Sequence, residues 1–129
     1  MTIPETIILI DDDPLNNKIC TYLLGRYFPQ PVPIRAFTNP EEGLAYVLSL
    51  QTPQLTLVLL DLNMPELTGW QVLDALETFM TQAQAYIHIY ILSSSIDIRD
   101  REKTQLYPYV KGSLEKPLTR AQLDAVFQS

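Results

Sequence analysis

Five short apolar runs, separated by stretches with helical spacing, constrain the fold of this chain more than any other sequence feature. The runs have the length and composition of buried β-strands, and they lie at residues 6–10, 32–37, 55–60, 87–92 and 110–114. Residues 57–60 are apolar without interruption, which is typical of a strand covered on both faces. The alternation of strand and helix therefore predicts an α/β protein with a parallel sheet between two layers of helices.

Apolar stripes and helix-start signals indicate where the helices lie. Asn39 before Pro40 has the chemistry of a helix N-cap, and Thr119 with Gln122 has the spacing of a capping box. The stripe residues are Leu15, Ile19, Tyr22 and Leu23 in the first predicted helix, Leu44, Val47 and Leu48 in the second, Val72, Leu73, Leu76, Phe79 and Met80 in the third, and Leu123, Val126 and Phe127 in the last.

Residues 97–105 are the exception, because charged side chains leave almost no apolar stripe there. We expect this segment to form a weakly anchored helix with a solvated face and salt bridges. A mobile recognition element is the alternative interpretation.

Composition limits the class of protein. The length of 129 residues and the hydrophobic content of 47% predict a single domain, residues 1–129, with one core. A net charge of −6 argues against direct nucleic-acid binding, because phosphate contacts need clustered Lys and Arg. No apolar run reaches the roughly 18 residues of a membrane span and the N-terminus lacks a signal peptide, so we expect a cytoplasmic protein. Cys20, the only cysteine, excludes an intramolecular disulfide, and we expect a buried thiol.

Acidic residues follow two of the predicted strands. Asp11, Asp12 and Asp13 come directly after the first strand, and Asp61 follows the third. In open parallel sheets, ligands bind beyond the carboxyl ends of the strands where the strand order reverses, which is between the first and third strands in a 2-1-3-4-5 sheet. Asp11, Asp12 and Asp61 would then converge, and their oxygen ligands suit Mg²⁺. Asp13 is better placed to cap the first helix.

Further polar residues fall at the same edge of the predicted sheet. Ser93 follows the fourth strand, where its hydroxyl could bond to an oxygen above the sheet, and Lys116 follows the fifth, where it could pair with negative charge. Met64-Pro65 and Gly69 specify a particular loop after Asp61. Each residue is common by itself, but their alignment on one edge indicates a functional site.

Taken together, these residues resemble the signature of bacterial two-component response-regulator receiver domains, the group that includes the chemotaxis protein CheY. The resemblance covers essentially the whole chain: the acidic pair, the pattern Asp-x-x-Met-Pro-x-x-x-Gly from Asp61 to Gly69, the hydroxyl of Ser93, and Lys116-Pro117. It implies a flavodoxin-like fold, which is a doubly wound three-layer sandwich around a parallel sheet of order 2-1-3-4-5.

The resemblance also implies a role for each site residue. Asp61 would accept a phosphoryl group, Asp12 would ligate Mg²⁺ directly, and Asp11 would help to hold the ion, partly through water. The main-chain carbonyl of Asn63 would be another ligand. Ser93 would bond to the phosphoryl group once it arrives.

Lys116 would neutralise another phosphoryl oxygen, and the peptide bond between Lys116 and Pro117 is expected to be cis as in relatives. The phosphoryl donor would be a phosphohistidine on a sensor histidine kinase or a histidine phosphotransfer protein. New bonds from Ser93 and Lys116 would bias the charged helix after Ser95 and change the binding of a downstream protein, which the sequence does not identify. Such a protein is a signalling module that catalyses only its own phosphorylation and dephosphorylation, as a monomer or a weak phosphorylation-dependent dimer.

One residue departs from the family pattern. Relatives commonly place Tyr or Phe three residues before the lysine, as the rotating partner of the hydroxyl residue, whereas this chain has Ser113. Tyr107 and Tyr109 are candidate substitutes, although ordinary packing is the expected role of such tyrosines. His88 within a strand and Trp70 at a helix start are also expected to be packing residues.

Three other functions match part of the pattern. A magnesium-dependent phosphohydrolase of the haloacid-dehalogenase type is disfavoured, because its motifs occur in a different order and it needs more chain for a substrate cap. Flavodoxin-like cofactor binding is disfavoured because acids after the first strand would repel a phosphate. A receiver-fold interaction module that acts without phosphorylation stays open because of Ser113. We expect a stand-alone receiver without an output domain, and a fragment of a longer protein is the alternative.

Overall fold

The computed structural model describes residues 2–128. Its elements occur in the order β1 (Thr6–Ile10), α1 (Pro14–Tyr27), β2 (Ile34–Phe37), α2 (Pro40–Leu48), β3 (Thr56–Leu60), α3 (Gly69–Ala83), β4 (Ile87–Ser93), α4 (Ile98–Thr104), β5 (Val110–Glu115) and α5 (Arg120–Phe127). All strands are parallel and pair in the order β2-β1-β3-β4-β5. The predicted alternation and strand order are confirmed.

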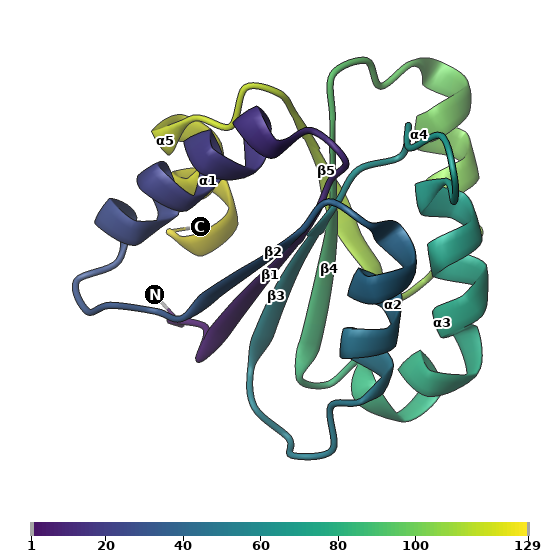
Figure 1. The fold of residues 1–129 in the computed structure, drawn as a ribbon, viewed down its shortest axis with the longest axis horizontal. Helices are drawn as coiled ribbons and strands as arrows, with labels where there is room; N and C mark the ends of the chain where they lie inside the picture. The colour runs from purple at the N-terminus through teal and green to yellow at the C-terminus, as the bar shows by residue number, and fades with distance from the viewer. Residues whose placement is uncertain (1, 129) are drawn as a thin grey trace.

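Helices cover both faces of the sheet, with α1 and α5 on one face and α2, α3 and α4 on the other (Figure 1). Successive strand residues point to opposite faces. Ile7 and Leu9 therefore pack in a core beneath α1 and α5, whereas Ile8 and Ile10 pack in a core beneath α2 and α3. The three-layer sandwich is confirmed, but the sheet separates two apolar cores where length alone predicted one. No helix within residues 2–128 is both long and apolar enough to cross a membrane.

Helices α1 and α2 begin at the predicted N-caps. Asp13 Oδ1 accepts a hydrogen bond from the N–H of Leu15 at 3.0 Å, so Asp13 caps α1 as expected. Asn39 Oδ1 accepts from the N–H of Glu41 at 2.9 Å, directly after Pro40 at the first helical position. Local side-chain chemistry therefore sets both boundaries.

Strand β2 is shorter than predicted. It begins at Ile34 rather than at Val32. Proline has no N–H to donate to a strand ladder, and Val32 lies between Pro31 and Pro33. The segment before Ile34 still contributes one bond, because the carbonyl of Pro33 accepts from the N–H of Ile7 at 2.9 Å.

Helix α1 buries a different face from the predicted one. Of the four residues of the predicted stripe, Leu15, Ile19 and Tyr22 are 63%, 44% and 63% exposed, and Leu23 is half-buried against the core beneath α1 and α5. The buried face lies about one residue further along the helix and consists of Asn16, Asn17, Cys20, Leu24 and Tyr27. The prediction was wrong because it relied on apolar residues alone, whereas the first turn of α1 is oriented by hydrogen bonds from its asparagines to Asp11.

Helix α4 is the least buried helix, as its composition predicted. None of its residues is buried, and Ile98 at its start is 73% exposed. Exposed ion pairs join Arg99 to Asp97 at 3.8 Å and Arg101 to Glu115 at 3.6 Å. Because exposed ion pairs of this kind contribute little, α4 is only weakly anchored.

Candidate functional site

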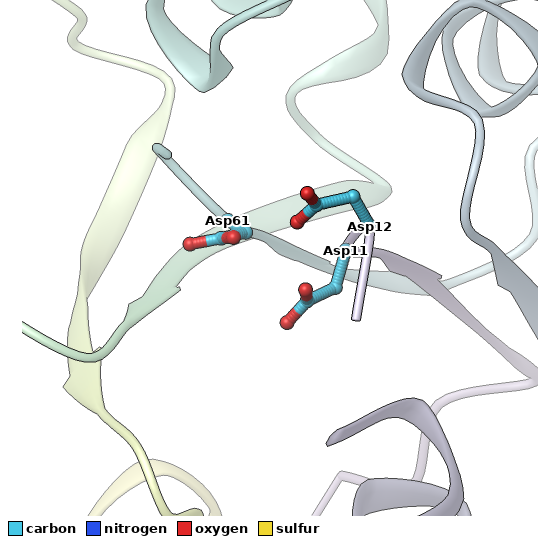
Figure 2. Close-up of side chains that lie close together, drawn as sticks. All are labelled: Asp11, Asp12 and Asp61. Carbon is cyan, nitrogen blue, oxygen red and sulfur yellow. The ribbon is translucent and has the colours of Figure 1, made fainter. Parts of the chain in front are cut away.

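Three carboxylates meet at the carboxyl ends of β1 and β3. The two strands are neighbours in register, with Ile10 opposite Leu60. Asp11 and Asp61, which directly follow the two strands, therefore lie side by side and are both buried, whereas Asp12 is exposed. One carboxylate oxygen from each of Asp11, Asp12 and Asp61 lies within 4.8 Å of the other two (Figure 2). The structure thus brings together the three acidic residues that the sequence placed at this edge.

Lys116 supplies positive charge between two of these acids. Its Nζ lies 2.6 Å from Asp11 Oδ2 and 3.4 Å from Asp61 Oδ2. Its backbone N–H donates to the carbonyl of Ser93 at 2.9 Å, which holds the end of β5 against β4. Burial of the ammonium opposes its charge, but the hydrogen bond to Asp11 and the charges of both acids outweigh burial and raise the pKa of Lys116. The peptide bond before Pro117 is cis, as expected.

Gln122 in α5 fixes the backbone on both sides of Lys116. Its Oε1 accepts from the N–H of Glu115 at 3.0 Å, and its Nε2 donates to the carbonyls of Glu115 and Pro117 at 3.0 and 3.1 Å. Thr119 caps α5 through the N–H of Gln122 at 3.2 Å. Only half of the predicted capping box therefore forms, because the Gln122 side chain bonds to the Lys116 segment instead of to the backbone of the cap.

Ser93 and Asn63 complete the hydrogen bonding around Asp61. Ser93 ends β4, is fully buried, and its hydroxyl donates to Asp61 Oδ1 at 3.2 Å. The backbone N–H of Asn63 donates to the same oxygen at 3.4 Å, and its side-chain Nδ2 donates to Ser93 Oγ at 3.3 Å. The two oxygens of Asp61 therefore face different partners: Oδ1 faces Ser93 and Asn63, and Oδ2 faces Lys116.

The carboxyl group of Asp61 binds its proton more tightly than an ordinary aspartate does. Burial is the largest cause of its raised pKa, and the negative charge of Asp11 adds to it. Lys116 and the hydrogen bonds from Asn63 and Ser93 act in the opposite direction without cancelling the shift. A cation bound beside Asp61 would favour the ionised form of its carboxyl group and so lower this pKa.

Comparison with known proteins identifies the family. A sequence model of the response regulator receiver domain matches residues 7–128. This chain belongs to the response regulator receiver domain family. No match was found when this receiver domain was compared with curated proteins.

Solved structures resemble this receiver domain over nearly its whole length. A two-component response regulator from Cytophaga hutchinsonii aligns with a TM-score of 0.81 at 24% identity, covering 98% of this chain and 96% of that one. A response regulator receiver protein from Dyadobacter fermentans gives 0.77 at 25% identity, with 96% and 98% covered. The chemotaxis protein CheY4 of Vibrio cholerae gives 0.77 at 17% identity, with 98% of both chains covered. The shared fold is the flavodoxin-like sandwich that the sequence predicted.

Gly69 sets how closely the receiver's third helix approaches the site. A Cβ atom at this position would overlap the carbonyl oxygen of Asp61 and lie 2.8 Å from the Cα of Leu62, which is closer than real Cβ contacts. The N–H of Gly69 also donates to the carbonyl of Leu62 at 3.0 Å. Only glycine allows the start of α3 to pack against the backbone of the Asp61 loop, which explains the glycine of the Asp61–Gly69 pattern.

Two asparagines of α1 belong to the site although sequence reasoning missed them. Asn16 Nδ2 donates to Asp11 Oδ2 at 2.8 Å, and Asn17 Nδ2 donates to the backbone carbonyl of Asp11 at 3.0 Å. Both are buried. Apolar periodicity cannot reveal such residues. The available signal was two adjacent amides in the first turn after an acidic pair.

The tyrosines proposed as substitutes for the missing aromatic partner of Ser93 are bonded to α3. The Tyr107 hydroxyl donates to Asp74 Oδ1 at 2.7 Å, and the buried Tyr109 hydroxyl donates to the carbonyl of Leu73 at 2.6 Å. Ser113, which occupies the usual aromatic position, is exposed in β5. The expected packing role of both tyrosines agrees with these contacts.

Three other residues that drew attention in the sequence lie outside the acidic cluster. Trp70 is half-buried and stacks on Tyr107 with ring centroids 5.8 Å apart, so it is a packing residue. His88 lies near the start of β4, at the opposite end of the strand from the site, and partial burial lowers its pKa. Cys20 is buried as expected, and burial raises the pKa of its thiol to about 11.

The donor set at the cluster suits a hard divalent cation. Asp11, Asp12 and Asp61 offer carboxylate oxygens close enough to share one ion, and no histidine or cysteine joins them among the described residues. Asp12 is exposed and can bind while water fills other positions. Magnesium, which keeps several waters and prefers carboxylates, fits this set.

Proposed function

We propose that this receiver domain accepts a phosphoryl group on Asp61 from the phosphohistidine of a sensor histidine kinase or a histidine phosphotransfer protein. One observation carries the proposal: a buried carboxylate lies between the hydroxyl of Ser93 and the ammonium of Lys116, beside two further carboxylates. Phosphoryl transfer needs positioning and charge neutralisation around the phosphorus more than it needs proton transfer. The site offers a nucleophile, a hydroxyl and the ammonium of Lys116 for this purpose, and its carboxylates would hold a divalent cation.

The reaction is a displacement at phosphorus. A carboxylate oxygen of Asp61 forms a bond to phosphorus as the bond from phosphorus to the imidazole nitrogen breaks, and the leaving imidazole keeps the electron pair. Water later attacks the acyl phosphate, which restores the carboxylate and releases inorganic phosphate. The domain therefore catalyses only its own modification and demodification and is a signalling module rather than an enzyme acting on other substrates.

Each neighbour of Asp61 has a role in this proposal. Ser93 donates to one phosphoryl oxygen, and Lys116 leaves its pairing with the acids to neutralise another. Asp12, Asp11, Asp61 and the main-chain carbonyl of Asn63 would hold Mg²⁺. When bound, the ion would reduce the repulsion between the carboxylate and the incoming phosphoryl group.

The signal is proposed to leave through α4 to a downstream protein. Its lack of buried residues makes α4 the helix that is easiest to shift once Ser93 and Lys116 change partners. The exposed stripe of Leu15, Ile19 and Tyr22 on α1 begins beside the site and offers apolar area to a partner. A cytoplasmic location, the absence of nucleic-acid binding, and a monomer or weak phosphorylation-dependent dimer remain predictions from the sequence.

A second candidate function is a receiver-fold interaction module that acts without phosphorylation. The observation that favours it is the replacement of the usual aromatic partner by Ser113, with Tyr107 and Tyr109 bonded to α3 rather than free to move toward Ser93. In that case the acidic cluster would have a structural role only.

Incubation with acetyl phosphate and Mg²⁺, followed by intact mass spectrometry, separates the candidates. We expect one labile phosphoryl group on the wild-type protein and none on Asp61→Asn. A matched control is Asp74→Asn, which changes an aspartate outside the site and should be modified like the wild type. Absence of modification would support the interaction module, and continued release of phosphate over many turnovers would support a hydrolase.

A further inference from the structure

The two buried asparagines of α1 bind different parts of Asp11. Asn16 and Asn17 are 7% and 5% exposed, and both donate from Nδ2. Asn16 contacts the carboxylate oxygen Oδ2, whereas Asn17 contacts the backbone carbonyl. Asparagine is usually exposed, and burying an amide is costly unless it is hydrogen-bonded. Two adjacent buried amides directed at one residue therefore indicate that Asp11 must be held in a defined position.

The carboxylate of Asp11 has three donors that differ in how permanent they are. The N–H of Asp13 donates to Oδ1 at 2.9 Å, and Oδ2 accepts from both Asn16 at 2.8 Å and Lys116 at 2.6 Å. Lys116 also lies 3.4 Å from Asp61 Oδ2. It is thus shared between two acids, and the proposed function requires it to move to the phosphoryl group. Once Lys116 has moved, Asn16 is the donor that stays on Oδ2.

We propose that Asn16 is a positioning residue that holds the Asp11 carboxylate in its metal-binding orientation, independently of Lys116. The inference rests on the proposed function of the site. The terminal torsion of an aspartate is soft, so its carboxylate turns unless both oxygens have partners. A side chain that hydrogen-bonds to a metal ligand and orients it affects metal affinity without contacting the metal. Asn16 lies in the first turn of α1, which Asp13 caps, so the backbone that carries its amide is held in place.

Direct binding of Mg²⁺ alone tests the role of Asn16. Isothermal titration calorimetry would compare the wild type, Asn16→Leu and Asn17→Leu. Leucine keeps the branched shape of the side chain and favours the helix, but it removes the donor. We expect Asn16→Leu to weaken Mg²⁺ binding about tenfold, the lower end of the range for losing such a partner. We expect Asn17→Leu, which loses an equally buried amide bound to the backbone carbonyl, to stay within about twofold.

Phosphorylation kinetics give a second readout that a general structural defect would not produce. With acetyl phosphate as donor, the Mg²⁺ concentration for half-maximal rate should rise about tenfold in Asn16→Leu, in step with the binding constant. The rate at saturating Mg²⁺ should change less than about twofold, because a filled site restores the orientation of Asp11. A structural defect would instead lower the rate at saturating Mg²⁺.

Each outcome decides the inference. Unchanged Mg²⁺ affinity in Asn16→Leu would overturn it, and so would equal weakening in both variants, since the effect would then belong to the turn as a whole. If Asn16→Leu does not fold, as judged by circular dichroism, Asn16→Ala replaces it with the same expectations. A wild-type protein that neither binds Mg²⁺ nor becomes phosphorylated would instead contradict the proposed function.

Discussion

Helices α1 and α3 both begin beside the acidic site, yet they contact it in different ways. α3 buries the apolar face that its sequence predicts, including Val72, Leu73, Leu76 and Met80. α1 buries Asn16 and Asn17 near its start and leaves Leu15, Ile19 and Tyr22 exposed.

The difference arises from the atoms through which each helix meets the site. α3 approaches through its backbone at Gly69, which packs against the backbone of Asp61 and needs no side chain there. Its remaining positions are free to form an apolar face. α1 approaches through side-chain amides that must reach Asp11, so the site decides which face of the helix turns inward. Apolar periodicity is therefore a sound guide to a helix only where the helix does not supply polar side chains to a site.

The largest effect that tests this contrast is expected in the centre of α3. Leu76 is 1% exposed and packs in the core beneath α2 and α3. Leu76→Ala should lower the free energy of unfolding by about 3 kcal/mol, because truncation leaves a cavity in a packed core. Urea unfolding followed by circular dichroism measures this loss. A loss below about 1 kcal/mol would mean that the apolar face of α3 is not tightly packed in the core.

The next largest effect concerns the backbone contact at the start of α3. Gly69→Ala should cost about 1–3 kcal/mol of stability, as overpacking does, because the new methyl group overlaps the backbone of the Asp61 loop. Phosphorylation by acetyl phosphate should also slow, since the loop must shift. The matched control is Gly25→Ala in α1, where an added Cβ meets nothing within 4 Å. That variant should be neutral or slightly stabilising, and equal losses in both variants would contradict the close-contact explanation.

Asp61→Asn should stabilise the protein at neutral pH in the absence of Mg²⁺, by on the order of 1 kcal/mol. Burial and the charge of Asp11 raise the pKa of Asp61 in the folded state. The wild type is therefore most stable with Asp61 protonated, and it loses that stability as the pH rises through the raised pKa. Asparagine stays neutral throughout. Urea unfolding between pH 3 and pH 7 should show a gain that disappears below the ordinary value of 3.8. A gain independent of pH would exclude charge as its cause.

A smaller effect is expected where the segment after α4 meets α3. Tyr107→Phe should cost up to about 1 kcal/mol, because it removes one hydrogen bond to the exposed Asp74 and keeps the stacking on Trp70. Tyr109→Phe should cost more, since its hydroxyl is buried and the carbonyl of Leu73 loses a buried side-chain donor. Hydrogen exchange of α4 amides should rise in Tyr107→Phe. Unchanged exchange would show that Tyr107 does not anchor α4.

The smallest effect is expected on the outward face of α1. Ile19→Ala should change the free energy of unfolding by less than about 0.5 kcal/mol, because the side chain is 44% exposed and alanine favours a helix. Measuring urea unfolding of Ile19→Ala and Leu76→Ala in parallel compares the two helices directly. If Ile19→Ala lost about as much stability as Leu76→Ala, the stripe first predicted from the sequence would be the buried face of α1 after all.

Much of the molecule could be predicted from its sequence, because the controlling interactions are local. Buried strands need uninterrupted apolar runs such as Leu57–Leu60, and N-caps need a short polar side chain such as that of Asp13 or Asn39. The convergence of Asp11 with Asp61 could be predicted from the strand order and the rule that parallel strands end at one edge.

Only the tertiary structure decided which partners these side chains take. Asn16 and Asn17 turn inward because Asp11 accepts their hydrogen bonds, and Gln122 leaves its expected capping partner because the backbone around Lys116 lies within reach. Lys116 itself bridges Asp11 and Asp61 across strands that are far apart in the chain. A local pattern records what a residue can do, but its choice among competing partners depends on which distant segments the fold brings within hydrogen-bonding distance.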